Sequence, residues 1–298
     1  MTSDDPPAAA GDRHTDIQPD SGPDTDTDIG VGAPIDPGVD VNVVAERLAA
    51  AGCVAADEEA ADFVVAAPDA ATLETWLRRR EQGEPPAWIT GTTVFCGRSL
   101  HVLPGVYVPR AQTEDLARRA AALLPASGRA VDLCTGTGAV AAHLRAEVPT
   151  AAVVGVDLDA RAAACARRNG VPAVVADIGA LPLASDAGLD VVTAVAPYVP
   201  TGDLGLLPAD VQRYEPRLAL DGGADGLDLV RRVVDAAGRL LHPGGWLLAE
   251  VGGIQDEALA PALAAAGFTR VDPWWDEDGD LRGVAARAGA GSPRPAAP

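Results

Sequence analysis

The most constraining feature of this chain is a glycine-rich segment, VDLCTGTG, at residues 131–138. It follows a short apolar run, residues 130–133, and precedes a helix-like stretch from Gly138 to Glu147. Glycines in a turn between a strand and a helix let the backbone approach a bound ligand, because a Cβ atom would collide with it. A tight turn without any ligand is the alternative interpretation.

Strand-like and helix-like segments alternate through the rest of the chain. Strands are expected at residues 152–156, 173–176, 190–195, 246–251, 268–274 and 281–287, and helices at residues 160–168, 227–241 and 256–266. This alternation is typical of a mostly parallel sheet with helices on both faces. The last two strands have no helix between them and predict an antiparallel hairpin at one edge. The fold class is therefore α/β, with a Rossmann-like core.

The chain before this core is organised differently. Residues 1–40 hold ten Asp and only one Arg, which predicts a disordered acidic tail at residues 1–39. Three helical stretches, the first capped by Asp40 and ended by Gly52, predict a small N-terminal helical module at residues 40–87. Residues 88–108, rich in Val, Thr, Phe and Tyr, predict a β-hairpin connector. The core domain is then expected at residues 109–287, followed by a disordered tail at residues 288–298.

Composition excludes several classes of function. The formal net charge is −20, and all 23 basic residues are Arg. Such acidity disfavours binding to a phosphate backbone, so no direct nucleic-acid partner is expected. No long apolar run or signal peptide is apparent, and the four scattered cysteines form no metal-binding pattern. We therefore expect a cytoplasmic monomer without a membrane partner or a metal.

Three acids indicate which cofactor the glycine-rich segment binds. Asp132 precedes the loop, Asp157 ends the next strand, and Asp177 follows the strand after that. Asp157 at a strand end is placed to accept both ribose hydroxyls of a nucleotide-like ligand. The segment also fits a relaxed dinucleotide fingerprint. However, Asp132 would repel a pyrophosphate and attract the α-ammonium group of S-adenosylmethionine, while Asp177 is placed for the adenine amino group. The acids favour S-adenosylmethionine.

Longer segments resemble one family. GEPPAWITGTTVFCGRSLHV (83–102), VPRAQTEDL (108–116), YEPRLALDGGADGLDLVRRVV (214–234) and GGWLLAEVGGIQ (244–255) are similar to segments of the HemK/PrmC-type protein-(glutamine-N5) methyltransferases. That family methylates the glutamine of the GGQ loop in peptide chain release factors. The resemblance runs from about Glu84 to Arg287. It implies a seven-stranded class I S-adenosylmethionine-dependent methyltransferase fold and a release factor as partner.

The resemblance also implies site residues. Cofactor-binding residues are expected at Asp132, Cys134, Thr135, Gly136, Thr137, Gly138, Asp157, Leu158, Asp177, Ile178 and Val195. Arg110, Glu114, Glu215 and Arg217 are expected to order the substrate side, with Arg110 and Glu114 at the junction of the module and the core. A solvated turn with an internal ion pair is the alternative for residues 215–217.

The departure from the family falls on the loop expected to be catalytic. Val195, Ala196, Pro197 and Tyr198 stand where the family has Asn-Pro-Pro-Tyr. In the family, the Asn side chain and the next backbone carbonyl accept the two N–H groups of the substrate amide. Ala196 retains a carbonyl and Tyr198 a ring, but Val195 has no side-chain acceptor, which leaves one donor unsatisfied at a cost of roughly 1–3 kcal/mol.

The sequence therefore predicts methylation of a release-factor glutamine, and Val195 keeps rival functions open. One rival is a paralogue with another acceptor, a small molecule or another protein. A second is a cofactor-binding protein that has lost catalysis. A third, methylation of nucleic-acid adenine, is disfavoured by the acidity and by the absence of Lys.

Overall fold

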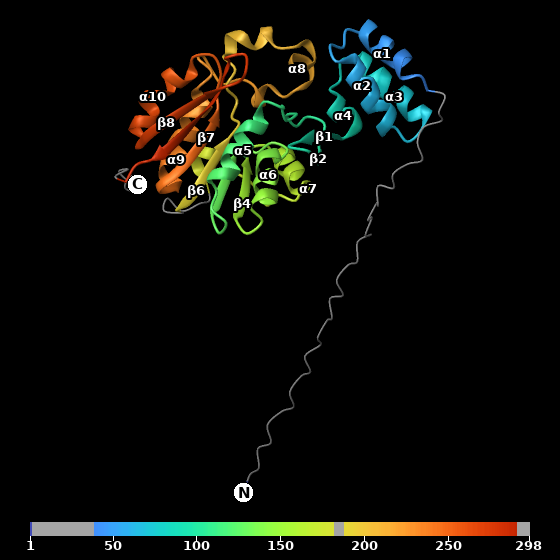
Figure 1. The fold of residues 1–298 in the computed structure, drawn as a ribbon. Helices are drawn as coiled ribbons and strands as arrows, with labels where there is room; N and C mark the ends of the chain where they lie inside the picture. The colour runs from blue at the N-terminus through green and yellow to red at the C-terminus, as the bar shows by residue number, and fades with distance from the viewer. Residues whose placement is uncertain (2–38, 182–187, 291–298) are drawn as a thin grey trace. The chain divides into compact units, whose positions relative to one another are not determined.

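The computed structural model describes Met1, residues 39–181 and residues 188–290 (Figure 1). The acidic tail expected at residues 1–39 lies outside the described residues, apart from Met1 and Val39. Most of the tail expected at residues 288–298 also lies outside them, and Ala288 still belongs to the last strand. Within the described ranges, no helix is both long and apolar enough to cross a membrane.

Three helices precede the core: α1 (Val41–Ala50), α2 (Ala56–Ala66) and α3 (Ala70–Glu81). The Asp40 side chain caps α1 by accepting a hydrogen bond from the backbone N–H of Asn42 at 2.9 Å. Leu48 and Phe63 are fully buried between the helices. The ring of Trp76 packs on that of Phe63, with 5.8 Å between the centroids. The helices thus share a small apolar core of their own.

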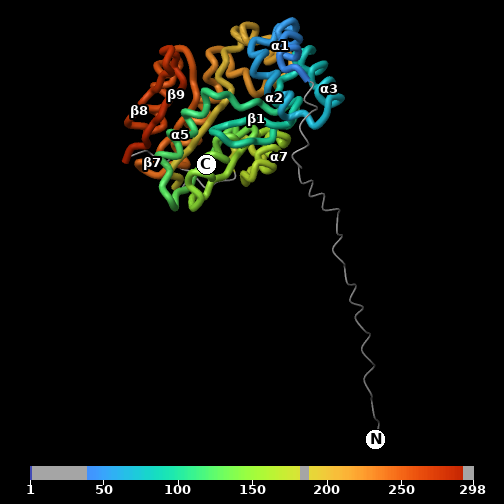
Figure 2. Tube along the Cα trace, turned by 45° about the vertical axis from the view of Figure 1, so that its right-hand side comes forward, coloured from blue at the N-terminus to red at the C-terminus, as the bar shows by residue number. Residues whose placement is uncertain are grey.

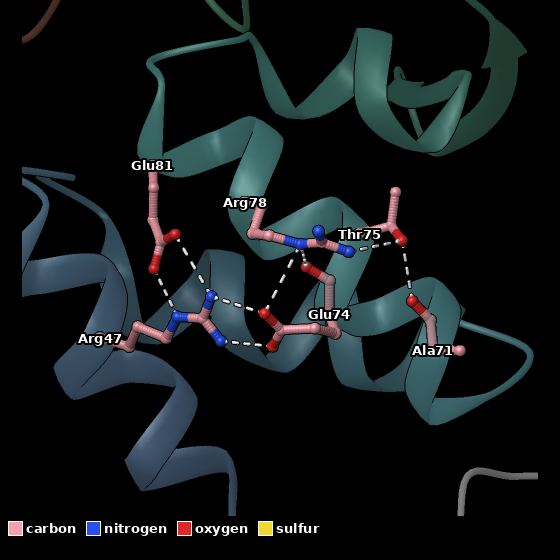
Figure 3. Close-up of polar contacts among 6 residues, drawn as sticks. All are labelled: Arg47, Ala71, Glu74, Thr75, Arg78 and Glu81. Carbon is pink, nitrogen blue, oxygen red and sulfur yellow. Dashed lines mark hydrogen bonds and ion pairs between the residues drawn. The ribbon is translucent and has the colours of Figure 1, made fainter.

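An ion-pair network joins α1 to α3 on the surface of these helices (Figure 3). The guanidinium of Arg47 on α1 lies between Glu74, at 2.5 Å, and Glu81 on α3. Arg78 approaches Glu74 from the other side, at 3.6 Å. A guanidinium fork that meets two carboxylates fixes the relative orientation of the two helices. Because these side chains are partly exposed, each pair contributes at most about 1 kcal/mol.

The connector differs in part from the expectation. Its hairpin consists of β1 (Thr92–Phe95) and β2 (Arg98–His101), shorter than the expected range 88–108. Trp88 instead belongs to a short helix, α4 (Pro86–Thr90), which Pro86 favours because its fixed φ suits the first helical turn. The indole Nε1 of Trp88 donates to the carbonyl of Val106 at 2.9 Å. The outer boundaries of this connector stay a prediction.

Seven strands form the main sheet in the order β5-β4-β3-β6-β7-β9-β8. They are β3 (Arg129–Leu133), β4 (Ala152–Asp157), β5 (Ala173–Val175), β6 (Leu189–Ala194), β7 (Leu241–Glu250), β8 (Phe268–Trp275) and β9 (Leu281–Ala288). The first five strands in the order pair in parallel, and β9 is antiparallel to both of its neighbours. The predicted seven-stranded fold with an antiparallel edge hairpin is confirmed. β7 begins at Leu241 rather than Trp246, because Leu241 pairs with Leu189 before the register shifts.

Helices cover both faces of this sheet. Val131 and Leu133 of β3 pack in one core with α9 (Asp228–Leu240) and α10 (Gln255–Ala265). Ala130 packs in the opposite core with α5 (Thr113–Leu123) and α6 (Ala139–Glu147), as the two-residue period of a strand requires. A further helix, α7 (Ala160–Arg168), lies against β4 and β5, at the opposite end of the sheet from β8 and β9 (Figure 2).

The strand order reverses between β3 and β6, which lie side by side. Ligands in open α/β sheets bind beyond the carboxyl ends of the strands at such a reversal. The glycine loop, residues 134–138, follows β3, and the 195–198 loop follows β6. Short helices complete the chain near these loops: η1 (Ile178–Ala180), η2 (Thr201–Leu206), α8 (Ala209–Tyr214) and η3 (Arg217–Ala219).

Candidate functional site

The glycine loop has two glycines with different roles. Both adopt positive φ, 57° at Gly136 and 80° at Gly138. A Cβ atom at Gly136 would meet nothing within 4 Å, so this position leaves space for a ligand. At Gly138 a Cβ atom would lie 2.9 Å from the Cβ of Ala166 on α7. Gly138 is therefore required for helix packing, and the expected close approach to a ligand applies to Gly136.

Asp132 lies buried beneath the glycine loop. Its two oxygens accept hydrogen bonds from the Thr135 hydroxyl at 2.6 Å and the Thr193 hydroxyl at 2.7 Å. Burial raises the pKa of Asp132 to about 6, although both hydrogen bonds oppose the shift. A carboxylate with this pKa is largely ionised at neutral pH and places a negative charge in a poorly solvated position.

Asp157 joins the end of β4 to the glycine loop. One oxygen accepts from the backbone N–H of Gly136 at 2.8 Å, and the other from the N–H of Asp159 at 2.9 Å. Burial raises the pKa of Asp157, and these two hydrogen bonds oppose the shift. Each carboxylate oxygen has further acceptor capacity. The carboxylate is thus fixed in orientation and retains capacity for ligand hydroxyls.

Asp177 and Ile178 follow β5. One oxygen of Asp177 accepts from the N–H of Gly179 at 2.8 Å and also pairs with Arg232 of α9. The other oxygen has no hydrogen bond within the described residues, and Ile178 is buried beside it. No feature of the sequence indicated that Arg232 lines the site. It lies on a helix far along the chain, where a charged residue is usually interpreted as part of the solvent-exposed face.

These residues line one cavity of about 240 Å³. Every expected cofactor-binding residue except Gly138 lies in its wall. The charged side chains in the wall, among the described residues, are Asp132, Asp157, Asp159, Asp177 and Arg232. Carboxylates thus outnumber the single guanidinium, and the cavity favours a cationic ligand over a pyrophosphate.

Asn169 supports the cavity from outside and was not expected to contribute. Its amide nitrogen donates to the carbonyl of Thr137 in the glycine loop at 2.8 Å and to that of His101 at 2.9 Å. Its oxygen accepts from the N–H of His101 at 2.7 Å. One side chain therefore ties the glycine loop to strand β2. Nothing in the sequence indicated this role, because the partners are distant along the chain.

The 195–198 loop separates the first cavity from a second one. Val195 and Pro197 line both cavities, while Ala196 and Tyr198 line the second, which has a volume of about 370 Å³. Ala196 is buried. All four residues that the sequence predicted as catalytic therefore line the second cavity, and Val195 and Pro197 line the first as well.

A hydrogen-bond network holds Tyr198 in place. The Tyr198 hydroxyl donates to Oε1 of Glu250 at 2.7 Å, and the Thr113 hydroxyl donates to Oε2 at 2.7 Å. The amide nitrogen of Gln112 lies 3.3 Å from both the Tyr198 hydroxyl and Oε1 of Glu250. Burial raises the pKa of Tyr198 well above its usual value, and the Glu250 charge adds to the shift. Tyr198 therefore stays a neutral phenol. Gln112 was missed by the sequence analysis.

The four residues expected to order the substrate side make separate contacts. Arg110 pairs with the buried Glu215 at 2.5 Å, and its guanidinium also covers the ring of Tyr107, at 4.9 Å. Burial raises the pKa of Glu215, and the Arg110 charge opposes the shift. Arg217 pairs instead with Asp221, at 2.9 Å. The alternative of an internal ion pair within residues 215–217 is therefore wrong.

Glu114 lies at the junction between the hairpin and the core. Its Oε1 accepts from the backbone N–H of Cys96 at 2.7 Å, and its Oε2 pairs with Arg118. Cys96 has a φ of 49°, a conformation that side chains other than Gly rarely adopt. Glu114 thus fixes the hairpin turn against α5, and its role in ordering the substrate side stays a prediction.

The sheet order and the acidic cavity at its reversal define a class I S-adenosylmethionine-dependent methyltransferase. A family model described as "Methyltransferase domain" matches residues 130–213. A release factor glutamine methyltransferase from Geobacter sulfurreducens is 38% identical over 217 residues, which cover 72% of this chain and 76% of the relative. The chain belongs to the family of release factor glutamine methyltransferases.

Two further proteins show the range of similarity. A 4-amino-L-phenylalanine/4-methylamino-L-phenylalanine methyltransferase from Streptomyces pristinaespiralis is 38% identical over 231 residues, which cover 74% of this chain and 78% of the relative. A solved 16S rRNA N2 G1207 methyltransferase from T. thermophilus, in complex with AdoMet and guanosine, has 20% identity and a TM-score of 0.46. That alignment covers 69% of this chain and 46% of the other.

Proposed function

We propose that this chain transfers a methyl group from S-adenosylmethionine to the side-chain amide nitrogen of a glutamine in a peptide chain release factor. The observation that carries the proposal is the position of the 195–198 loop between two adjoining cavities. The first cavity suits the cofactor, and the second is the space for an acceptor. The names of relatives such as the Geobacter sulfurreducens protein support the choice of acceptor.

In this proposal the acidic residues of the first cavity hold the cofactor. Asp157 accepts the ribose hydroxyls, since its orientation is fixed by Gly136 and Asp159. Asp132 attracts the α-ammonium group, and the unengaged oxygen of Asp177 accepts from the adenine amino group. Gly136 leaves room for the ligand next to the backbone. The donor set therefore fits this cofactor.

The bound cofactor supplies an electrophilic methyl group: the acceptor nitrogen forms the new N–C bond, the C–S electrons remain on sulfur, and the nitrogen releases one proton to water. An amide nitrogen is a weak nucleophile, because its lone pair is delocalised into the carbonyl. The protein therefore acts by positioning. The backbone carbonyl of Ala196 accepts one N–H, and the ring of Tyr198 packs beside the acceptor, held by Glu250.

Transfer of labelled methyl from S-adenosylmethionine to purified release factor tests the proposal. We expect label on the wild-type factor and none on a factor whose GGQ glutamine is replaced by Ala. Equal labelling of both factors would place the methyl group elsewhere. Absence of label from the wild-type factor, with cofactor binding intact, would refute the choice of acceptor.

One observation favours a second candidate, N-methylation of a small aromatic amine. Val195 places an apolar side chain at the wall of both cavities, and an aromatic amine retains more of its lone pair than an amide does. A relative at 38% identity is named for methylation of 4-amino-L-phenylalanine. The same assay with 4-amino-L-phenylalanine as acceptor distinguishes the two candidates. Transfer to this amine and not to release factor would favour the second one.

A further inference from the structure

The second cavity, which we call the acceptor cavity, has few side chains that accept a hydrogen bond. Its wall contains Tyr107, Arg110, Gln112, Tyr198 and Asp210 beside apolar residues and backbone. A guanidinium has no acceptor atom. The Tyr198 hydroxyl already donates to Glu250 and receives a contact from Gln112. An acceptor nitrogen with two N–H groups needs a second partner besides the Ala196 carbonyl, since Val195 offers none.

Gln112 carries an amide whose orientation the neighbouring carboxylate determines. Glu250 is buried, and it accepts hydrogen bonds from the hydroxyls of both Tyr198 and Thr113. A carboxylate that receives these donors presents only acceptor atoms to a third partner. The nitrogen of the Gln112 amide must therefore face Glu250, at 3.3 Å, and the amide oxygen must point away from it.

The Gln112 oxygen is free to bind an acceptor molecule. No hydrogen bond to this oxygen occurs within the described residues, whereas the nitrogen has two contacts. The backbone of Gln112 directly precedes α5, and the adjacent Thr113 is buried and bonded to Glu250. The amide is thus held at its nitrogen end and on a fixed backbone, in the wall of the acceptor cavity.

We propose that Gln112 hydrogen-bonds the N–H of the methyl acceptor through its amide oxygen, and so replaces the acceptor group that Val195 lacks. This inference rests on the proposed function. Gln112 contacts Tyr198, which lies three residues after Val195 on the same loop, and both residues line the acceptor cavity. Asp210 is the rival acceptor, but it lies in the first turn of α8, and one of its oxygens already accepts from the N–H of Val211 at 3.0 Å.

A rescue experiment tests this role with purified release factor as the acceptor and saturating cofactor. Gln112→Leu removes the amide oxygen, and we expect single-turnover methyl transfer to fall about tenfold or more, the effect of one lost hydrogen bond in the transition state. Adding Val195→Asn supplies an amide oxygen from the 195–198 loop, and we expect it to restore most of the lost rate. In the wild-type background, Val195→Asn should change the rate much less.

Controls separate this role from a structural one. Gln82→Leu makes the same chemical change on the C-cap residue of α3, which is exposed like Gln112 but lies outside the lining of both cavities, and it should leave the rate unchanged. If Gln112→Leu lowers the melting temperature, Gln112→Met, which has an unbranched side chain, replaces it in the assay. We expect Gln112→Met to show the same loss of methyl transfer. The dissociation constant for S-adenosylmethionine should stay unchanged in the Gln112 and Gln82 variants, neither of which alters a residue of the first cavity.

Each remaining outcome contradicts the inference. Unchanged transfer by both Gln112 variants would show that this oxygen does not touch the acceptor. A loss that Val195→Asn fails to restore would assign Gln112 to the support of Tyr198 alone. No transfer to release factor by the wild type or by Val195→Asn, with cofactor bound, would overturn the proposed function and this inference together.

Discussion

Replacing Asp157 tests the cofactor site at its most constrained carboxylate. In Asp157→Ala the ribose hydroxyls lose their acceptor, and the backbone N–H groups of Gly136 and Asp159 lose theirs. We expect S-adenosylmethionine to bind far more weakly, while the sheet and its two apolar cores remain intact. The carboxylate lies at the end of β4, outside both cores.

The size of the effect follows from the bonds that are lost. A hydrogen bond to a charged group contributes about 1.5–3 kcal/mol. Two ribose hydroxyls therefore correspond to about 3–6 kcal/mol, or an affinity about a hundredfold to ten-thousandfold lower. Removing a carboxylate whose pKa is raised by burial offsets part of this loss, because an unfavourably desolvated charge disappears with it. We therefore expect a value near the lower end.

Isothermal titration of the wild type and Asp157→Ala with S-adenosylmethionine measures the difference directly. An analogue of the cofactor without the 2′-hydroxyl provides the matched control. This analogue should bind the wild type more weakly than S-adenosylmethionine does. It should bind Asp157→Ala with about the same affinity as S-adenosylmethionine binds that variant. Thermal unfolding of both proteins verifies that the variant is folded.

Equal affinity of the two proteins for S-adenosylmethionine would refute the reasoning. Preferential binding of NAD by the wild type would be equally damaging, because it would mean that the acidic wall does not exclude a pyrophosphate. If the ratio of the dissociation constants of Asp157→Ala and the wild type is the same for the analogue as for S-adenosylmethionine, Asp157 does not contact the 2′-hydroxyl of the ribose.

Three further results are expected. Gly138→Ala should lower the free energy of unfolding, measured in urea, by about 1–3 kcal/mol, because its Cβ would lie 2.9 Å from that of Ala166. The pKa of Asp132 is raised to about 6, so the carboxylate loses its charge when the pH is lowered through 6. The affinity for the cofactor, measured by titration, should therefore decrease below about pH 6, and Asp132→Asn should remove this pH dependence. Arg110→Ala should destabilise the protein by about 3 kcal/mol in urea, since Glu215 would keep a buried charge without a partner. Replacing the partly exposed Arg47 by Ala should cost about 1 kcal/mol or less, because its partner Glu74 is exposed and stays solvated.

The sequence determined the order and type of the core elements. Apolar runs such as those ending at Leu133 and Asp157 are short and bounded by glycine or charge, and the helices between them carry an apolar face. These signals are local, because a strand or helix is selected by the periodicity of a few consecutive residues. For the same reason the β-hairpin connector is expected to begin at Trp88, whereas Trp88 lies in a short helix that begins at the second of two successive prolines.

Nearly all of the residues that the sequence predicted for cofactor binding lie in the wall of one cavity. Asp132 and Asp157 lie in the carboxyl-terminal ends of two neighbouring parallel strands, and Gly136 follows the first of them, so the topology alone brings them together. It did not distinguish the two glycines, because only the distance to Ala166 on α7 shows that Gly138 serves packing.

The tertiary structure alone decided the acceptor side and the supporting contacts. Gln112 and Tyr198 meet at Glu250 although long stretches of chain separate them, and Asn169 binds Thr137 and His101 in the same way. The geometry of such side-chain hydrogen bonds depends on how strands and helices pack, and it leaves no periodic trace in the chain. The sequence could therefore show which group Val195 lacks, and only the folded arrangement brings a candidate replacement, Gln112, into the same cavity.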